Sequence, residues 1–461
     1  MGLRRKALGV AASLAGVALI VTGCSGNSSD GSPTAGGSGT GADTAPATIR
    51  VMLWGNDQDI TSIKDAAKGF STAHPEVTIE WETGDCAVDY AACKTLAAGG
   101  NLPDVFVPGT WTYFDAVRDG IVENLTPYLE KSGTSTSDFT PAVIKALTAS
   151  DGNLYGLPMG YNIQSLFYNK DEFDGAGLSY PPADGSYTYD DVREWAKKLT
   201  LDKAGHDAGD PAFDPSQTQQ WGYTNSISIP IPQGYLPVLA AFGGGILGGP
   251  NRDQCTADSP ETIAGFQWLA DLMWTDHTAI TPQLGQEEAG SSRWVRGQVA
   301  MQFGSHEQVA AVQAQNPALN FGIAALPKGP AGNATLWQAQ VWSMSAQSEV
   351  KDAAWEFVRY MSTDGAGKQM ALIPAYKDLA QGPDFAQAPG EPADLAAAQI
   401  EPASWPLAIT NTDPTGVWGL VTSQDGIAPA LDDIISGRKS ASEALNGICA
   451  STIDALLQGT K

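Results

Sequence analysis

From residue 48 onward, short apolar runs alternate with segments whose apolar residues recur at helical spacing. Thr48–Trp54 is a β-branched, apolar run, which is typical of a buried parallel strand. Helical spacing follows from Ile60 to Phe70, and Val77–Trp81 then alternates as a second strand. A strand, a helix and a strand with short connections form a βαβ unit. The folded part of the chain therefore opens as an α/β domain with a mostly parallel sheet.

The same two periodicities continue to the end of the chain. We predict further strands and helices, with the strands at 104–107, 166–168, 299–303 and 321–326 and the helices at 90–98, 189–199, 262–274, 350–361 and 441–457. Thr188 and Asp191 form a capping box at the start of the helix 189–199. We interpret the tryptophans inside these helices as core residues, namely Trp195, Trp268, Trp274 and Trp355.

Length and charge limit the class of protein. A chain of 461 residues is too long for one ordinary core, so we expect two lobes or domains. The net charge is −25 and the isoelectric point is near 4.3. Such a surface repels the phosphate backbone of nucleic acids and anionic lipid, and it weighs against an anionic ligand. The composition therefore argues against nucleic-acid binding.

The first residues are typical of an export signal. Residues 4–6 are basic, and residues 7–21 form an apolar stretch too short for a membrane-spanning helix of about 20 residues. The stretch ends in residues 21–24 (VTGC), which resemble a bacterial lipobox, although an ordinary signal peptide with a nearby cysteine is the alternative. We predict a lipoprotein signal peptide at 1–23, with Cys24 as the lipidated residue.

A tether and a lipid anchor follow from this interpretation. Residues 24–47 are dominated by small and polar residues, so they cannot bury enough surface to fold, and we predict a flexible tether. No later stretch is apolar enough to span a bilayer, so the lipid on Cys24 is the predicted anchor at the outer side of the cell membrane. The paired Arg4 and Arg5 fit either general or twin-arginine export.

The remaining cysteines favour disulfides, because an exported chain with an even number of cysteines usually pairs them. Cys86 and Cys93 are close enough in sequence to close a short loop, and Cys255 with Cys449 follows by elimination. A zinc site is the rival, but the histidines are scattered and show no ligand spacing. We therefore expect no metal and no cofactor. The acidic segment 202–214 lacks the spacing of an EF-hand, so we interpret it as a solvated loop.

Several short blocks occur in a telling order, namely 70–77 (FSTAHPEV), 97–105 (AAGGNLPDV), 120–125 (GIVENL), 155–158 (YGLP), 166–170 (LFYNK), 297–301 (GQVAM), 326–330 (LPKGP) and 353–358 (AAWEFV). Together they resemble the family of extracellular solute-binding proteins that includes maltose-binding protein. Each block alone is weak evidence for the family, but agreement at this many sites over residues 49–457 is specific evidence for it.

The resemblance implies an α/β fold of the two-lobed, type II periplasmic-binding-protein kind. Each lobe would be a mostly parallel sheet flanked by helices, with the ligand cleft between the lobes and a hinge motion that closes it. The chain would cross between lobes three times, near 160–163, 335–341 and 401–417. The implied lobes are discontinuous, with 48–160 and 341–400 in the N-terminal lobe and 163–335 and 417–461 in the C-terminal lobe.

A sugar site needs aromatic side chains for the faces of the ring and planar polar side chains for its hydroxyls. In α/β sheets such residues follow the carboxyl ends of strands. Trp54 and Asp57 follow the first strand, Glu82 follows the second, and Thr110 and Trp111 follow the third. For Asp57, a solvated loop residue or a helix cap is an equal alternative.

The resemblance adds candidates at the crossings and after the strand 299–303, namely Tyr161, Asn162, His306, Glu307, Trp337, Gln338, Trp418, Gln424 and Asp425. Asn162 stands where maltose-binding protein has an acidic ligand contact, so the ligand or its pose would differ here. Glu307 stands where the family often has a stacking tryptophan, so the usual stacking platform is in doubt.

We predict a monomeric extracytoplasmic solute-binding lipoprotein that captures an oligosaccharide and delivers it to the permease subunits of an ABC-type importer. It is not expected to be an enzyme, because GxSxG and Walker A motifs are absent from the sequence. The alternatives are a binding protein for a polyol or glycerol phosphate, a lipid-anchored glycosidase with Glu82 and Glu307 as paired carboxylates, and a sensory receptor. The sequence does not identify the sugar, its length or its linkage.

Overall fold

A computed structural model describes residues 46–84, 86–87, 89–109, 112–224, 232–249, 253–367, 369–383, 385–410 and 418–459. The predicted signal peptide, Cys24 and the tether up to residue 45 lie outside these residues. The chain divides into two units, Met1–Asp43 and Thr44–Lys461, and every described element belongs to the second.

The first sheet begins as the predicted strand–helix–strand unit. Strand β1 (Ala47–Leu53) pairs in parallel with β2 (Val77–Thr83) and with β3 (Val105–Phe106). Helix α1 (Asp57–Ala73) joins β1 to β2, and Asn56 caps it by accepting hydrogen bonds from two amides of its first turn. The carboxyl ends of β1, β2 and β3 therefore lie at one edge of the sheet.

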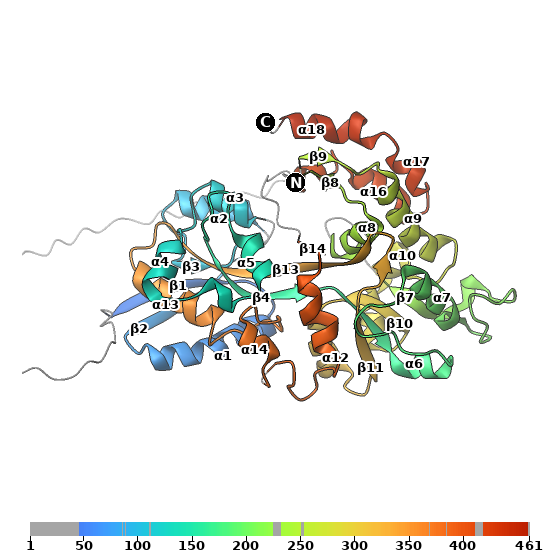
Figure 1. The fold of residues 1–461 in the computed structure, drawn as a ribbon, viewed down its shortest axis with the longest axis horizontal. Coiled ribbons are helices and arrows are strands. Elements are labelled where there is room, and N and C mark those ends of the chain that lie inside the picture. The colour runs from blue at the N-terminus through green and yellow to red at the C-terminus, as the bar shows by residue number, and fades with distance from the viewer. Residues whose placement is uncertain are drawn as a thin grey trace, which may run out of the picture. The chain divides into compact units, whose positions relative to one another are not determined.

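Three strands at the predicted crossings belong to the same sheet, in which β4 and β14 each pair with β13. The long strand β13 (Gly332–Met344) runs antiparallel to β3, to β4 (Leu157–Ile163) and to β12 (Lys328–Gly329), and parallel to β14 (Leu407–Thr410). Figure 1 shows β4 and β13 side by side at the centre of the ribbon. The predicted crossings at 160–163 and 335–341 thus fall within two paired strands.

The second sheet has five strands in the order β11, β5, β10, β7 and β6. Their bounds are β11 (Phe321–Ala325), β5 (Ser165–Asn169), β10 (Val299–Gly304), β7 (Thr218–Thr224) and β6 (Leu201–Asp202). Only the pairing of β10 with β7 is parallel, so the prediction of a mostly parallel sheet is wrong for this sheet. Since only Gln164 separates β5 from β4, β5 enters the sheet without a crossover helix and runs against both of its neighbours.

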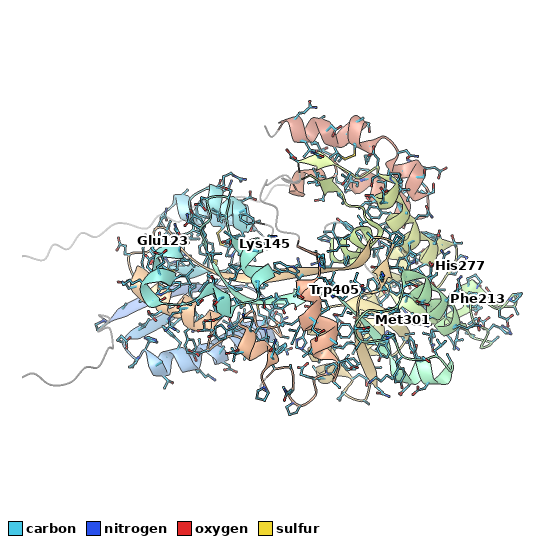
Figure 2. All side chains as sticks on the ribbon, in the orientation of Figure 1. Glu123, Lys145, Phe213, His277, Met301 and Trp405 are labelled. Carbon is cyan, nitrogen blue, oxygen red and sulfur yellow. A yellow bond between two sulfur atoms is a disulfide. The ribbon has the colours of Figure 1, made fainter. Side chains whose placement is uncertain are left out.

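Helices pack against both sheets. The helices after β2 and beside the first sheet are α2 (Tyr90–Ala98), α3 (Tyr113–Arg118), α4 (Thr126–Ser132), α5 (Pro141–Leu147), α13 (Lys351–Ser362) and α14 (Lys377–Gln381). The others are α6 (Lys170–Gly175), α7 (Tyr189–Leu199), α8 (Leu236–Phe242), α9 (Pro260–Trp274), α10 (Pro282–Glu287), α11 (Gly290–Val295), α12 (Glu307–Gln315), α15 (Trp418–Val421), α16 (Ala428–Ile435), α17 (Ala441–Leu445) and α18 (Asp454–Gly459). Figure 2 shows side chains filling the space around β10, where Met301 is fully buried.

Two details of the predicted helices are wrong. The helix expected at 441–457 is divided into α17, a π-helical turn at Cys449–Ile453 and α18, because Gly447 has a left-handed φ of 77° after α17. Trp274 lies at the end of α9 with 39% of its surface exposed, and its indole nitrogen donates a hydrogen bond to the carbonyl oxygen of Ile435. Trp268 and Trp355 are buried, as predicted.

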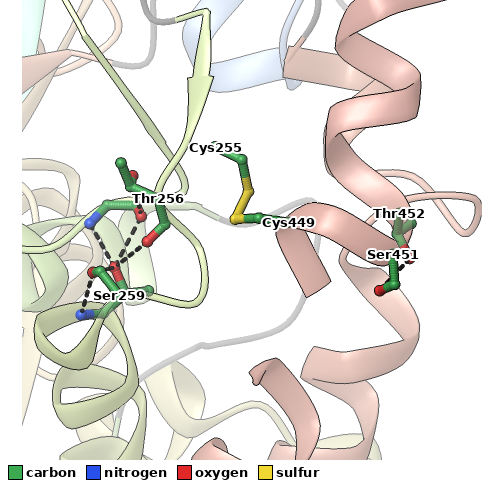
Figure 3. Close-up of a disulfide and its surroundings, with 8 residues drawn as sticks. Cys255, Thr256, Ser259, Cys449, Ser451 and Thr452 are labelled. Atoms are coloured by element: carbon green, nitrogen blue, oxygen red, sulfur yellow. Dashed lines mark hydrogen bonds between the residues drawn. A yellow bond between two sulfur atoms is a disulfide. The ribbon is translucent and has the colours of Figure 1, made fainter. Parts of the chain in front are cut away.

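Both predicted disulfide pairings are present. Cys86 is bonded to Cys93, beside Met52 and Phe106 in a small apolar cluster behind the β2–α2 loop. Cys255 is bonded to Cys449 and thereby fastens β9 (Gln254–Cys255) to the C-terminal helical segment, as Figure 3 shows. Among the described helices, none is long and apolar enough to cross a membrane.

Candidate functional site

The paired strands β4 and β13 present one polar face. On β13, Gln338 and Gln340 alternate with buried apolar residues, and Gln338 lies directly opposite Asn162 of β4. Because side chains along a strand alternate between its two faces, these three side chains point to the same side.

Two further residues complete this polar group. Asn162 donates a hydrogen bond from Nδ2 to Glu307 Oε2 at 2.7 Å, and Glu307 is the first residue of α12. Gln233, from the short turn Pro232–Gly234, donates from Nε2 to Gln338 Oε1 at 2.7 Å. We call Asn162, Gln233, Glu307, Gln338 and Gln340 the amide–carboxylate cluster. It joins residues of β4, β13, α12 and the turn before α8.

The cluster contains buried acceptors that lack a partner. Asn162 Oδ1, Gln233 Oε1 and Gln340 Oε1 are inaccessible to solvent and have no hydrogen-bond partner among the described residues. A buried acceptor left unpaired costs about 1–3 kcal/mol, so native proteins usually satisfy such atoms with protein, water or ligand. The cluster is therefore suited to receive hydrogen-bond donors from a bound molecule.

Glu307 gives the cluster its negative charge. Desolvation raises the pKa of Glu307, hydrogen bonds from Ser305 and Asn162 and the proximity of His306 lower it, and the charge of Asp59 raises it further. Asp59 lies in the first turn of α1, so α1 and α12 bring two carboxylates toward one another. In the described part of the chain, no lysine or arginine forms an ion pair with Glu307. The residue is nevertheless exposed, so a bound molecule can reach it.

Three of the predicted contacts are buried away from the polar face, and their role as ligand contacts stays a prediction. Tyr161 is fully buried and Trp337 is 2% exposed, and both belong to the large apolar core rather than to the polar face. Strand alternation is the reason, because Tyr161 precedes Asn162 and Trp337 precedes Gln338 along their strands. His306 is 4% exposed and places Nδ1 2.7 Å from the carbonyl oxygen of Ala371 and Nε2 2.8 Å from Glu391 Oε2. Both ring nitrogens are thus committed to protein contacts.

No described hydrogen bond or ion pair joins the candidates after the first two strands to the cluster. Asp57 is the exposed first residue of α1, whereas the cap is Asn56. Glu82 forms an ion pair with Arg50, with 2.5 Å between Oε1 and Nε, so its carboxylate already has a partner. Trp54 is half-buried against the core, and its Nε1 has no hydrogen-bond partner in the described ranges. Its role as a ligand contact stays a prediction.

The other candidates also stay predictions. Thr110 and Trp111 lie outside the described residues, and so does the side chain of Trp418 at the start of α15. Gln424 and Asp425 are exposed in the turn between α15 and α16, and no described hydrogen bond joins either side chain to the cluster.

Three residues of the site region were missed from the sequence. Gln340 is two positions beyond Gln338, so strand alternation was the signal that could have found it. Asp59 is the N3 residue of the capping box that Asn56 opens, which is also a sequence pattern. Gln233 lies in a Pro-Gln-Gly turn that carries no signal for the cluster. Among the described residues, no group of histidine, cysteine, aspartate and glutamate side chains could hold a metal ion.

A separate hollow of about 480 Å³ lies beside α4 and α5. Its walls are formed by backbone turns and by hydroxyl and aliphatic side chains, and Thr126, Thr134, Ile144 and Leu154 are among them. It shares no residue with the amide–carboxylate cluster, so we do not assign the ligand to it.

Comparisons with known proteins agree with this architecture. The chain is 23% identical over 407 residues to the maltotriose-binding protein of Pyrococcus abyssi, covering 85% of this chain and 79% of that protein. It is 22% identical over 419 residues to the maltooligosaccharide ABC transporter solute-binding lipoprotein of Streptococcus pneumoniae, covering 88% of each.

The fold is that of type II periplasmic binding proteins. An ABC substrate-binding protein from Listeria monocytogenes, solved in complex with cycloalternan, superposes with a TM-score of 0.73 at 22% identity, covering 88% of this chain and 97% of that structure. The sequence pattern of the bacterial extracellular solute-binding protein family matches residues 54–368. Because this match spans more than half of the chain, the protein belongs to the family of bacterial extracellular solute-binding proteins.

Proposed function

We propose that the protein captures an oligosaccharide between its two lobes and delivers it to an ABC-type importer. The observation that carries the proposal is the amide–carboxylate cluster on the crossing strands, with its buried and unpartnered acceptors. The maltotriose-binding and maltooligosaccharide-binding relatives support a sugar as the ligand, and the second relative supports an ABC transporter as the partner.

The chemistry of the cluster fits the hydroxyl groups of a sugar. Each hydroxyl can donate one hydrogen bond and accept others, so it can satisfy an amide oxygen and accept from another group. Asn162 and Gln233 already use their NH₂ groups on Glu307 and Gln338, which leaves their oxygens free for such donors. Trp54, Trp111 and Trp418 are the proposed stacking partners for the faces of the sugar ring.

Closure of the lobes would then bury the sugar. The lobes are proposed as 48–160 with 341–400 and 163–335 with 417–461, and β4 and β13 carry the chain between them. A ligand that contacts both lobes stabilises the closed state by the difference of its affinities for the closed and open states. The closed surface is what the importer would recognise.

Two other chemistries are less well supported by the cluster. A phosphate ligand needs lysine, arginine or a helix N-terminus for its charge, and the only charged member of the cluster is the carboxylate of Glu307. A glycosidase needs two carboxylates facing each other, but Glu82 is paired with Arg50 and no described contact joins it to Glu307. We propose that the protein binds its sugar without turnover, and incubation with labelled oligosaccharides tests this, since release of shorter products would overturn it.

The anchor is proposed to be lipid on Cys24, with the small and polar residues up to 47 as the tether. Cys24→Ser should release the protein from the membrane fraction into the medium, while its thermal unfolding stays unchanged. Retention of the variant in the membrane fraction would show that another feature holds it there.

A matched pair of variants tests the sugar site. Asn162→Ala should lower the affinity for the bound oligosaccharide by about tenfold or more, because a good hydrogen bond to a charged partner and one ligand contact are lost together. Asn320→Ala is the control, since Asn320 makes the same kind of bond, 2.7 Å from Nδ2 to Asp171 Oδ1, on an exposed surface. Isothermal titration against di- and trisaccharides measures both, and equal affinities for the two variants would remove Asn162 from the site.

A further inference from the structure

The unpartnered amide oxygens of the cluster are all acceptors. The orientation of two amides is fixed by their partners, because the NH₂ groups of Asn162 and Gln233 face the acceptors of Glu307 and Gln338. Their oxygens must therefore point away from these partners, and both are buried without a donor among the described residues. A ligand that donates hydrogen bonds therefore fits the site better than one that mainly accepts them.

The negative charge of the site also favours a ligand that donates hydrogen bonds. Glu307 and Asp59 are close enough for the charge of Asp59 to raise the pKa of Glu307. No cationic side chain of the described residues pairs with Glu307, and the neighbouring His306 is occupied by Glu391 and the carbonyl oxygen of Ala371. A neutral sugar would hydrogen-bond here but would bring no opposite charge to Glu307.

We infer that the site takes an oligosaccharide that carries a protonated amine, such as a glycosamine unit. This rests on the proposed function and narrows its substrate class. An ammonium group offers three donors and one positive charge, so it matches the amide oxygens and the carboxylate of Glu307 at once. A uronic acid or a sugar phosphate would instead be repelled.

The surroundings of Glu307 strengthen its interaction with a protonated amine. The carboxylate is exposed and can be reached by a ligand, yet surrounding protein atoms desolvate it, as the direction of its pKa shift indicates. An ion pair in such surroundings is stronger than one in bulk water, because the effective dielectric constant is lower. The amine should therefore add affinity beyond that of the hydroxyl it replaces.

Matched sugar pairs test the inference. The probes are maltose, maltotriose, cellobiose and cellotriose, each titrated beside its counterpart with amino groups in place of the 2-hydroxyls. In any series that binds, the amino sugar should bind at least tenfold more tightly than its neutral partner. The ratio should shrink between about 20 and about 500 mM sodium chloride, because salt screens the ion pair.

Two isosteric variants assign the effect to Glu307. Glu307→Gln should bring the affinity ratio of amino sugar to neutral sugar close to one, whatever its effect on the affinity for the neutral sugar. Glu261→Gln is the control, because Glu261 is also an exposed glutamate in the first turn of a helix, α9, and it should keep the full ratio. Melting temperatures of both variants show whether they are folded.

The outcomes separate this inference from the proposed function. If neutral sugars bind as tightly as their amino counterparts, or if Glu307→Gln keeps the preference, the inference is wrong while the oligosaccharide function stands. If no member of any pair binds, the proposed function fails, and the preference for an amine fails with it.

Discussion

The disulfide between Cys255 and Cys449 should be the larger covalent contribution to stability. It joins residues 194 positions apart, whereas Cys86 and Cys93 are 7 positions apart. In the chain-entropy model, a cross-link lowers the entropy of the unfolded chain by an amount that grows with the logarithm of the loop length. For these separations the model gives about 5 kcal/mol for the long loop and about 2 kcal/mol for the short one at 25 °C.

The structure identifies what the long disulfide holds in place. Cys449 begins the π-helical turn before α18. Within the segment 441–459, Leu445, Ile453 and Leu457 are buried in a second apolar core, which also contains Phe266 and Leu431. α17 also packs against α9 and α16. If the segment unfolds together with that core, the full loop-closure term applies. If it detaches alone, the loss appears first as local opening.

Two double variants give the measurement. Cys255→Ser with Cys449→Ser should lower the free energy of unfolding by about 3 kcal/mol more than Cys86→Ser with Cys93→Ser, as read from urea titrations followed by circular dichroism. Amide hydrogen exchange at 441–459 should also rise in the first variant only. Equal costs for the two variants, or unchanged exchange at 441–459, would refute the assignment of this stability to loop closure.

Three further predictions concern stability. Burial raises the pKa of Glu172 to about 8, so between its ordinary pKa and pH 8 the folded state holds a proton that the unfolded state has lost. The melting temperature should therefore fall as the pH rises through this range, and Glu172→Gln should make the melting temperature less dependent on pH. A Cβ at Gly222 would lie 2.1 Å from the carbonyl oxygen of Ala196, so Gly222→Ala should lower the free energy of unfolding by about 1–3 kcal/mol in urea titrations. Gly285→Ala is the control, because a Cβ there meets open space within α10 and should leave the free energy of unfolding unchanged or raise it. Desolvation raises the pKa of Asp202, but hydrogen bonds from three backbone amides and from the His206 side chain outweigh this effect and bring the pKa to about 2. The folded state therefore loses stability as the pH falls toward 2 and the carboxylate takes up a proton, and Asp202→Asn should reduce this loss in urea titrations at low pH.

The sequence predicted most elements of the fold because the two periodicities are local. The helix at 189–199 has the predicted bounds and the predicted capping box of Thr188 and Asp191. The direction of β5 could not be predicted, because it depends on which strands lie beside it rather than on its own residues. The break at Gly447 was readable in principle, since a glycine after a short helix favours a left-handed end.

The candidate site could also be predicted only in part. The resemblance predicted crossings near 160–163 and 335–341 and proposed Tyr161 with Asn162 and Trp337 with Gln338. Neighbours on a strand point to opposite faces, so only one of each pair can lie on the polar face. Gln233 could not be predicted, because only the folded chain brings its turn beside Gln338.

Two departures from the pattern of maltose-binding protein turn out to be one feature. The resemblance places an acidic residue where Asn162 stands and often a stacking tryptophan where Glu307 stands. In the structure these two side chains are hydrogen-bonded to each other at 2.7 Å. In this protein the carboxylate is at the start of α12, and the amide of Asn162 on β4 donates a hydrogen bond to it. A change at either position alone would remove the hydrogen bond between them, so the two residues should be energetically coupled. The site consequently keeps a negative charge where a stacking ring is usual, and this is why its ligand should be chosen by charge and hydrogen-bond donors at that point.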